Sequence, residues 1–149
     1  MKIPSALLCL ALSAILAVPA LSAADTHAKG PEVAQISQGR EIKLSDYVVT
    51  GKTTIFDFSS DYCPPCRGYT EPLARLHAKR DDIAVVRVDV NRPGIKRIDW
   101  DSPVVHEFNL ESIPHFKIYG PDGKLVASDG PEDYSAREMV DKWIAELGR

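Results

Sequence analysis

Apolar residues along this chain gather into short β-branched and aromatic runs, separated by stretches with helical spacing. Residues 53–58 and 83–90 have the composition of strands, and the second run is apolar at nearly every position, as buried parallel strands are. Between these runs, apolar side chains recur at helical spacing and predict a helix that ends near residue 80. A strand, a helix and a second strand in this order predict a parallel pair joined by a crossover helix.

The remaining elements follow from shorter signals. Residues 39–44 alternate and predict a first strand, and residues 104–108 predict a helix that Ser102 begins, with Pro103 at its first position. Residues 115–119 and 124–128 flank a glycine-containing turn and predict a hairpin. A capping box of Ser135 and Glu138 predicts the start of a final helix. The expected order is β, β, α, β, α, β, β, α, which indicates an α/β domain.

The first 24 residues differ from the rest of the chain. Lys2 precedes an almost wholly apolar run over residues 3–18, and small residues follow Pro19. This pattern predicts a cleavable export signal over residues 1–24. An uncleaved membrane anchor is the alternative, but the run is shorter than the roughly 20 residues that a spanning helix needs. Residues 25–38 predict a flexible lead-in, and residues 39–149 predict the folded domain.

Composition and charge narrow the class of protein. A chain of 149 residues with 44% hydrophobic and 26% charged residues has room for one globular domain. Without Lys2, 17 basic and 21 acidic side chains remain, a formal charge of −4 with no basic cluster. Nucleic-acid binding is therefore unsupported, and we expect no membrane span once the signal is removed.

The cysteines carry the clearest chemical signal. Cys9 lies in the predicted signal and would leave with it, so that Cys63 and Cys66 remain as a pair in an exported chain. A structural staple is one interpretation, although closing so short a loop removes little entropy from the unfolded chain. The pair sits where a strand passes into a helix, whose unpaired N–H groups and dipole stabilise a thiolate. We therefore predict a redox-active dithiol.

Three motifs together resemble the thioredoxin family over roughly residues 40–147. They are residues 57–66 with their Cys-Pro-Pro-Cys, residues 87–90, and Ile113-Pro114 followed by a strand and a glycine-containing hairpin. The resemblance implies a thioredoxin fold, with a central mixed sheet of four to five strands flanked by helices. It also implies roles for four residues: Cys63 as the attacking thiol, Cys66 as the resolving thiol, Pro114 as a cis-proline against the disulfide, and Asp57 as a buried acid.

Residues 39–52 also resemble the exported thioredoxin-like reductases that serve cytochrome c maturation and related periplasmic tasks. The chain departs from ordinary thioredoxin at three positions. Ser59 and Tyr62 stand where that family usually has tryptophans, and Arg87 stands where a lysine near the buried acid is common. We therefore expect an exported, periplasmic reductase of protein disulfides, and the three departures argue against assigning cytosolic thioredoxin reductase as its electron donor.

The expected mechanism is dithiol exchange. A thiolate on an exposed Cys63 attacks a substrate disulfide, and Cys66 then attacks Cys63 to release the reduced product. Asp57, six residues earlier on the strand, would be raised in pKa by burial and take the proton of Cys66. A solvated Asp57 on an edge strand is the alternative. We interpret Asp61 as a solvated loop acid.

The residues next to the cysteine pair predict its substrate contacts and its reduction potential. Pro64 and Pro65 lack N–H groups, so the Cys63 sulfur can accept backbone hydrogen bonds only from later residues such as Cys66. A less stabilised thiolate predicts a reducing couple. Ile113 could pair its backbone with an extended substrate, and Tyr62 and Pro64 complete the expected substrate contacts. We expect disulfide-containing proteins as substrates, an unidentified electron donor, no cofactor and a monomer.

Two other classes of function remain open. A Cys-x-x-Cys pair with His115, and less readily His106, could hold copper or zinc, although tetrahedral zinc wants two further ligands. We assign no metal ligands. A non-catalytic module that binds through the cis-proline groove is the other alternative. His115 is interpreted as a packed or surface residue, and His77 and His106 as solvated.

Overall fold

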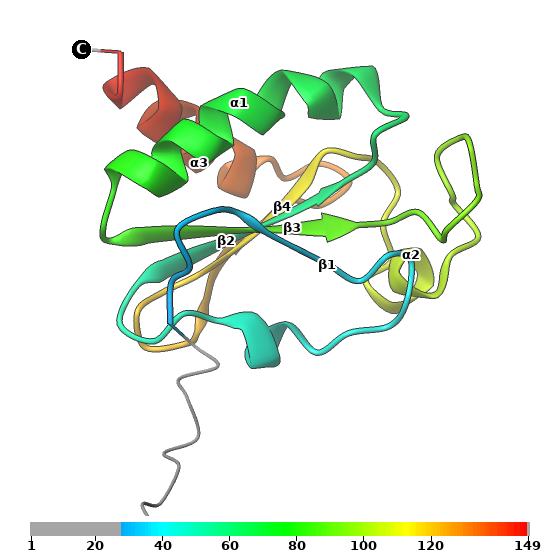
Figure 1. Ribbon diagram of the computed structural model, residues 1–149, viewed down its shortest axis with the longest axis horizontal. Coiled ribbons are helices and arrows are strands. Elements are labelled where there is room, and N and C mark those ends of the chain that lie inside the picture. The colour runs from blue at the N-terminus through cyan, green and yellow to red at the C-terminus, as the bar shows by residue number, and fades with distance from the viewer. Residues whose placement is uncertain (1–27, 149) are drawn as a thin grey trace, which may run out of the picture.

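A five-stranded mixed sheet forms the centre of the protein in a computed structural model that describes residues 28–148 (Figure 1). The strand order is β1-β3-β2-β4-β5. Strands β1, β3 and β2 are parallel neighbours, whereas β4 runs antiparallel to both β2 and β5. The strands are β1 Ala34–Ile36, β2 Thr53–Ser59, β3 Ile83–Asp89, β4 His115–Tyr119 and β5 Leu125–Ser128. This is the thioredoxin fold that the sequence predicted.

Helices cover both faces of the sheet. Figure 1 shows α1 and α3 on one face, with α2 and a 3-10 helix on the other. The bounds are α1 Pro64–Lys79, α2 Pro103–Glu107 and α3 Ser135–Glu146, with the 3-10 helix at Leu44–Tyr47. The predicted export signal with Cys9, and the lead-in as far as His27, lie outside the described residues. Among residues 28–148, no helix combines the length and the apolar character needed to cross a bilayer.

The alternation of side chains along β2 decides which residues face the active-site helix. Successive residues of a strand point to opposite faces. Ile55 packs in the core cluster beneath α1 and α3, whereas Phe56 and Phe58 pack in the cluster on the α2 side. Asp57 and Ser59 share the face of Ile55 and therefore lie on the side of α1.

The predicted first strand was wrong. Residues 39–44 form no strand. The first strand is β1, which pairs with β3 and forms one edge of the sheet. Ser37, Gln38 and Gly39 have φ of 77°, 53° and 75°, and this left-handed backbone turns the chain away from any ladder. β1 is only three residues long and mostly exposed. Its main chain pairs with β3, but none of its side chains is fully buried, so the sequence shows no extended alternation of apolar and polar residues there.

The predicted capping box was also wrong. Tyr134 occupies the N-cap position of α3 and makes no side-chain capping bond. Ser135 N donates instead to Asp133 Oδ1 at 2.8 Å. Glu138 N, which a capping box would pair with the Ser135 hydroxyl, donates to the carbonyl oxygen of Tyr134 instead. The start of α2 was predicted correctly, with Ser102 at the N-cap and Pro103 in the first turn.

Candidate active site

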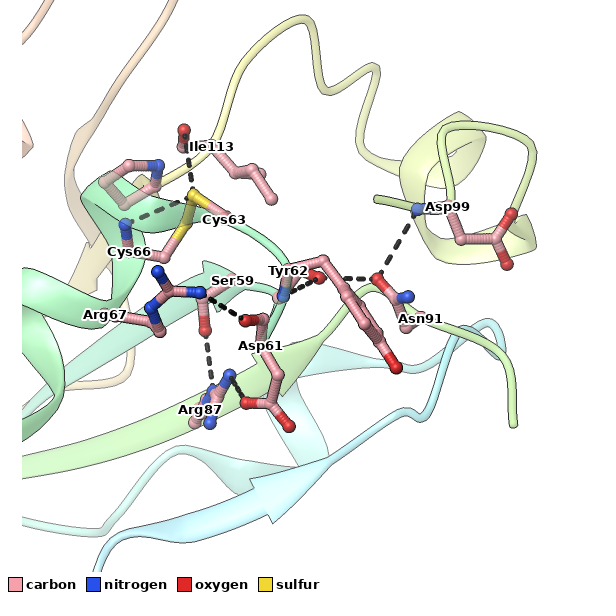
Figure 2. The surroundings of a disulfide bond; sticks show 12 residues. Ser59, Asp61, Tyr62, Cys63, Cys66, Arg67, Arg87, Asn91, Asp99 and Ile113 are labelled. Carbon is pink, nitrogen blue, oxygen red and sulfur yellow. Dashed lines mark hydrogen bonds and ion pairs between the residues drawn. A yellow bond between two sulfur atoms is a disulfide. The ribbon is translucent and has the colours of Figure 1, made fainter. Parts of the chain in front are cut away.

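The two cysteines meet at the mouth of α1. Cys63 is the N-cap residue and prolines occupy the start of the helix, because their fixed φ suits a first turn whose N–H groups would be unpaired anyway. Cys63 and Cys66 form a disulfide with Cα atoms 5.2 Å apart. Cys66 N donates to Cys63 Sγ at 3.2 Å (Figure 2). The prediction that Cys66 is a backbone donor to this sulfur is confirmed.

The Ile113-Pro114 peptide bond is cis and lies against the disulfide. Cys63 Sγ is 3.6 Å from the carbonyl oxygen of Ile113, and Figure 2 shows that oxygen next to the sulfur pair. Residues 50 positions apart in the sequence therefore form one site. Within residues 28–148, the Ile113 N–H has no hydrogen-bond partner. It is free to pair with an extended chain placed along this segment.

The disulfide is buried, contrary to the expectation of an exposed Cys63. Cys63 is 1% exposed and Cys66 2%, and the Ile113 carbonyl lies against the Cys63 sulfur. The exposed residues beside the pair are Tyr62, at 44%, and Pro64. A thiolate that attacks this disulfide must therefore displace part of this rim before it reaches Cys63.

Asp57 is a buried acid in the middle of the sheet, as predicted. It is 4% exposed on β2, which is enclosed by β3 and β4, so the alternative of a solvated edge-strand acid is wrong. Burial raises the pKa of Asp57 from 3.8 to about 7, and the nearby charge of Arg87 and a hydrogen bond from Ser59 partly oppose that rise. Among the described residues, Asp57 Oδ1 has no hydrogen-bond partner. Such a carboxyl can accept a proton near neutral pH.

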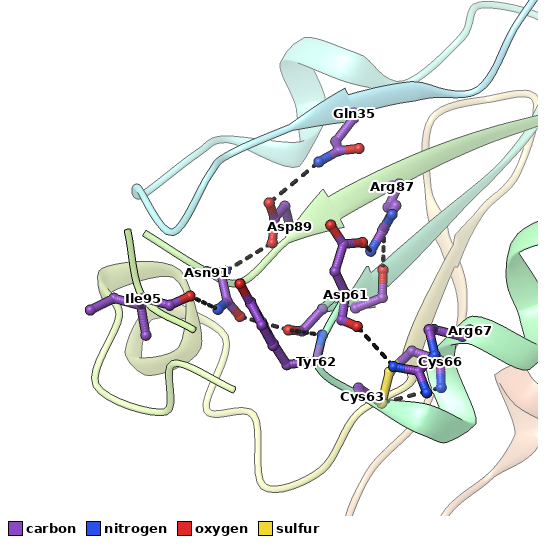
Figure 3. A network of polar contacts seen from close by, with 12 residues as sticks. Gln35, Asp61, Tyr62, Cys63, Cys66, Arg67, Arg87, Asp89, Asn91 and Ile95 are labelled. Carbon is purple, nitrogen blue, oxygen red and sulfur yellow. Dashed lines mark hydrogen bonds and ion pairs between the residues drawn. A yellow bond between two sulfur atoms is a disulfide. The ribbon is translucent and has the colours of Figure 1, made fainter. Parts of the chain in front are cut away.

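Arg87 joins Ser59 at the end of β2 to Asp61 of the active-site loop, a connection that the sequence did not predict. Its Nε donates to Ser59 Oγ at 2.8 Å, and its Nη2 donates to Asp61 Oδ1 at 2.7 Å (Figure 3). Asp61 is an exposed loop acid, as predicted, and it is also ion-paired with Arg87. The small side chain of Ser59, where relatives usually carry tryptophan, is a hydrogen-bond acceptor for Arg87. That departure from the family pattern was the available signal.

Removing the charge of Arg87 is expected to raise the pKa of Asp57 further above about 7, because the guanidinium favours the ionised carboxylate. Arg87→Gln should shift the acid limb of the pH–rate profile for disulfide reduction to higher pH. Arg87→Lys keeps the charge and should shift it less. Titration of the Asp57 carboxyl by NMR would check the assignment, and an unchanged pKa in Arg87→Gln would contradict it.

A buried asparagine fixes the loop that carries Tyr62. Asn91 Oδ1 accepts a hydrogen bond from Ser60 Oγ at 2.7 Å, and Tyr62 N donates to that same hydroxyl oxygen at 3.1 Å. Asn91 Nδ2 donates to the Ile95 carbonyl at 3.1 Å. Figure 3 shows the Tyr62 ring between Asn91 and the cysteines. Tyr62 and Asn91 also line a cleft of about 450 Å³. No local motif marks Asn91, because its partners are distant in the sequence.

The three histidines within residues 28–148 do not form a cluster with the cysteines. His77 is 3% exposed, contrary to the expectation of a solvated side chain: its Nδ1 accepts from Val85 N at 2.9 Å, and its Nε2 lies 3.0 Å from Gly30 O. His106 is exposed and His115 is buried. Residues 28–148 contain no group of three or more His, Cys, Asp or Glu that could hold a metal ion.

Comparison with known proteins places this geometry in a family. The family model described as Thioredoxin matches residues 40–145. The chain is 27% identical over 105 residues to thioredoxin H-type of Brassica oleracea, covering 69% of this chain and 79% of that protein. It is 26% identical over 129 residues to probable nucleoredoxin 3 of Oryza sativa subsp. japonica, covering 73% of this chain.

The chain spans only 26% of the length of that nucleoredoxin. Among solved structures, the thioredoxin of Trypanosoma brucei brucei is similar, with a TM-score of 0.52 and 15% identity. That comparison covers 80% of this chain and 94% of the other. At this identity, the likeness supports the fold alone.

Proposed function

This chain belongs to the thioredoxin family of thiol-disulfide oxidoreductases, and on that premise we propose that it reduces protein disulfides in the cell envelope. The observation that carries the proposal is the Cys63–Cys66 disulfide at the start of α1, in contact with the carbonyl oxygen of Ile113. When reduced, the two cysteines can donate two electrons to a substrate disulfide, and the adjoining Ile113 segment offers a docking site for the substrate chain. No metal or organic group is needed for this exchange.

The reaction begins from the reduced pair. The Cys63 thiolate attacks one sulfur of the substrate disulfide, so that a mixed disulfide forms and one substrate thiolate leaves. Cys66 then attacks the Cys63 sulfur, which regenerates the Cys63–Cys66 disulfide and releases the second substrate thiolate. Asp57, with its pKa raised to about 7, accepts the proton that Cys66 gives up. Two electrons pass from the dithiol to the substrate in each cycle.

The substrate would dock as an extended segment along Ile113. Its main chain would pair with the free N–H of that residue, in the manner of strand addition. Tyr62 and Pro64 are exposed beside the buried cysteine pair. A substrate that contacts these two residues would displace them and so expose Cys63. We propose that the protein acts as a monomer and that a second, unidentified protein returns electrons to it.

The cellular location is proposed from the sequence of residues 1–24. A basic residue, an apolar run and a stretch of small residues together support export to the periplasm with cleavage before Asp25. Cell fractionation and N-terminal sequencing of the mature protein would test this. A protein that keeps its first residues and stays with the membrane fraction would favour the anchor instead.

The couple is expected to be reducing. The prolines at the start of α1 cannot donate to Cys63 Sγ, and within the described chain its one backbone donor is Cys66 N. The thiolate, and with it the reduced form, is therefore only modestly stabilised. Equilibration with glutathione should give a reduction potential closer to about −270 mV than to about −120 mV. A value near the oxidising end would contradict a reductant.

A further inference from the structure

A polar cavity adjoins the Ile113-Pro114 turn on the α2 side of the sheet. It has a volume of about 190 Å³ and is lined by Asn109, Ser112 and His115, with the 130–134 loop opposite them. Ser112 and His115 directly flank the cis bond that touches Cys63. A substrate that lies along Ile113 therefore has to pass the mouth of this cavity with a residue close to its reactive cysteine.

His115 is the polar side chain in the cavity wall that has unmet hydrogen-bonding capacity. The residue is 7% exposed, and among residues 28–148 its Nε2 has no hydrogen-bond partner. Nearly all buried polar side-chain atoms are paired in folded proteins. The ring is held in place on its other side by an edge contact with Phe58, at a centroid distance of 5.8 Å. The fold thus keeps an imidazole fixed but unsatisfied next to the docking segment.

The charge around the cavity favours an uncharged ligand. Burial, helped by the charges of Lys117 and Arg137, lowers the pKa of His115 to about 4. The imidazole is therefore neutral near pH 7, with one nitrogen as donor and the other as acceptor. Glu111 lines the cavity and disfavours a carboxylate. The positive charges of Lys117 and Arg137, which act on the imidazole, disfavour an ammonium group.

We propose that this His115 cavity is a specificity site that receives an uncharged hydrogen-bonding side chain of the substrate, such as Ser, Thr, Asn or Gln. The inference rests on the proposed disulfide reduction and deepens it, because it selects among protein disulfides by the residues that surround the cysteine. A side chain with a hydroxyl or a carboxamide satisfies His115, whereas an aliphatic side chain of similar size leaves it unpaired.

The test uses disulfide-linked peptides that carry Gln, Ser, Leu, Glu or Lys at one of the two positions on either side of the cysteine. At the position that meets the cavity, the wild-type protein should reduce Gln and Ser peptides with a kcat/KM roughly tenfold above that for Leu, mainly through a lower KM. The kcat/KM values for the Glu and Lys peptides should be similar to that for the Leu peptide. Equal rates for all peptides at every position would overturn the inference.

Two variants separate recognition from packing. His115→Gln places an amide near the position of Nε2 and should keep the preference, whereas His115→Phe fills the space without a hydrogen bond and should abolish it. Each variant is judged by the ratio of Gln to Leu rates, so that a general loss of activity cancels. A preference that survives in His115→Phe would overturn the inference. Failure of the wild type to reduce even a small aromatic disulfide would overturn the proposed function itself.

Discussion

Cys63→Ser should lower disulfide reduction by at least about a thousandfold, because serine at this position cannot attack a disulfide or form a mixed one. Cys66→Ser should behave differently. It keeps the attacking sulfur but loses the resolving one, so each molecule should stop as a stable mixed disulfide with its substrate. Insulin reduction measures the first effect. Mass spectrometry of complexes from cell-envelope extracts measures the second and identifies the partners.

The double variant Cys63→Ser/Cys66→Ser is the control for this experiment, and it should retain no partner under non-reducing conditions. Residual turnover in Cys63→Ser, or partners held on Cys66 rather than Cys63, would reverse the assigned roles. A non-catalytic binding module would give no insulin reduction in the wild type. The alternative of a metal-handling protein would instead show copper or zinc bound to protein purified under reducing conditions and lost in Cys63→Ser.

Asp57→Asn should slow the reaction while making the protein more stable at alkaline pH. A group that moves the Cys66 proton typically contributes about a hundredfold or more to the rate of its step. The loss should appear in the release of substrate from the mixed disulfide at neutral pH. Stopped-flow kinetics would resolve that step, and an unchanged release rate would remove Asp57 from the mechanism.

The stability effect follows from the direction of the pKa shift. The pKa of Asp57 is raised from 3.8 to about 7 in the folded protein, so the folded state binds more protons than the unfolded state between these values. The contribution of Asp57 to wild-type stability should therefore fall as the pH rises from about 4 to about 7, by up to roughly 4 kcal/mol, and stay lower above that range. Asp57→Asn should lack this decrease.

Urea denaturation of the disulfide form at pH 4 and pH 8 would measure this difference. The matched control is Glu71→Gln, which removes an exposed carboxyl from α1 and should leave the pH dependence of the wild type unchanged. If Asp57→Asn lost as much stability as the wild type between the two pH values, the buried carboxyl could not be the group that titrates.

Local sequence signals predicted the elements that bring Cys63, Cys66 and Asp57 together. The helical spacing after the cysteines has a period that a helix satisfies, and the short β-branched runs at residues 53–58 and 83–90 have the length and composition of strands. Strand alternation then required Asp57 to point to one face of β2, and the helix that follows the cysteines buries that face. The Ile113-Pro114 turn was recognised by its resemblance to a family motif.

Other features came only from the tertiary structure, because their partners lie far apart along the chain. β1 is defined by its pairing with β3, more than 50 residues later, and not by any pattern of its own. The same holds for three features of the segment that follows β2. They are the burial of Cys63, the ion pair of Asp61 with Arg87, and the hydrogen bonds that link Tyr62 through Ser60 to Asn91. The residue types and their local spacing determined the chemistry and the elements. Long-range packing decided how accessible the dithiol is and which side chains surround it. Solvent access to Cys63 depends on residues from several segments that come together only in the folded protein.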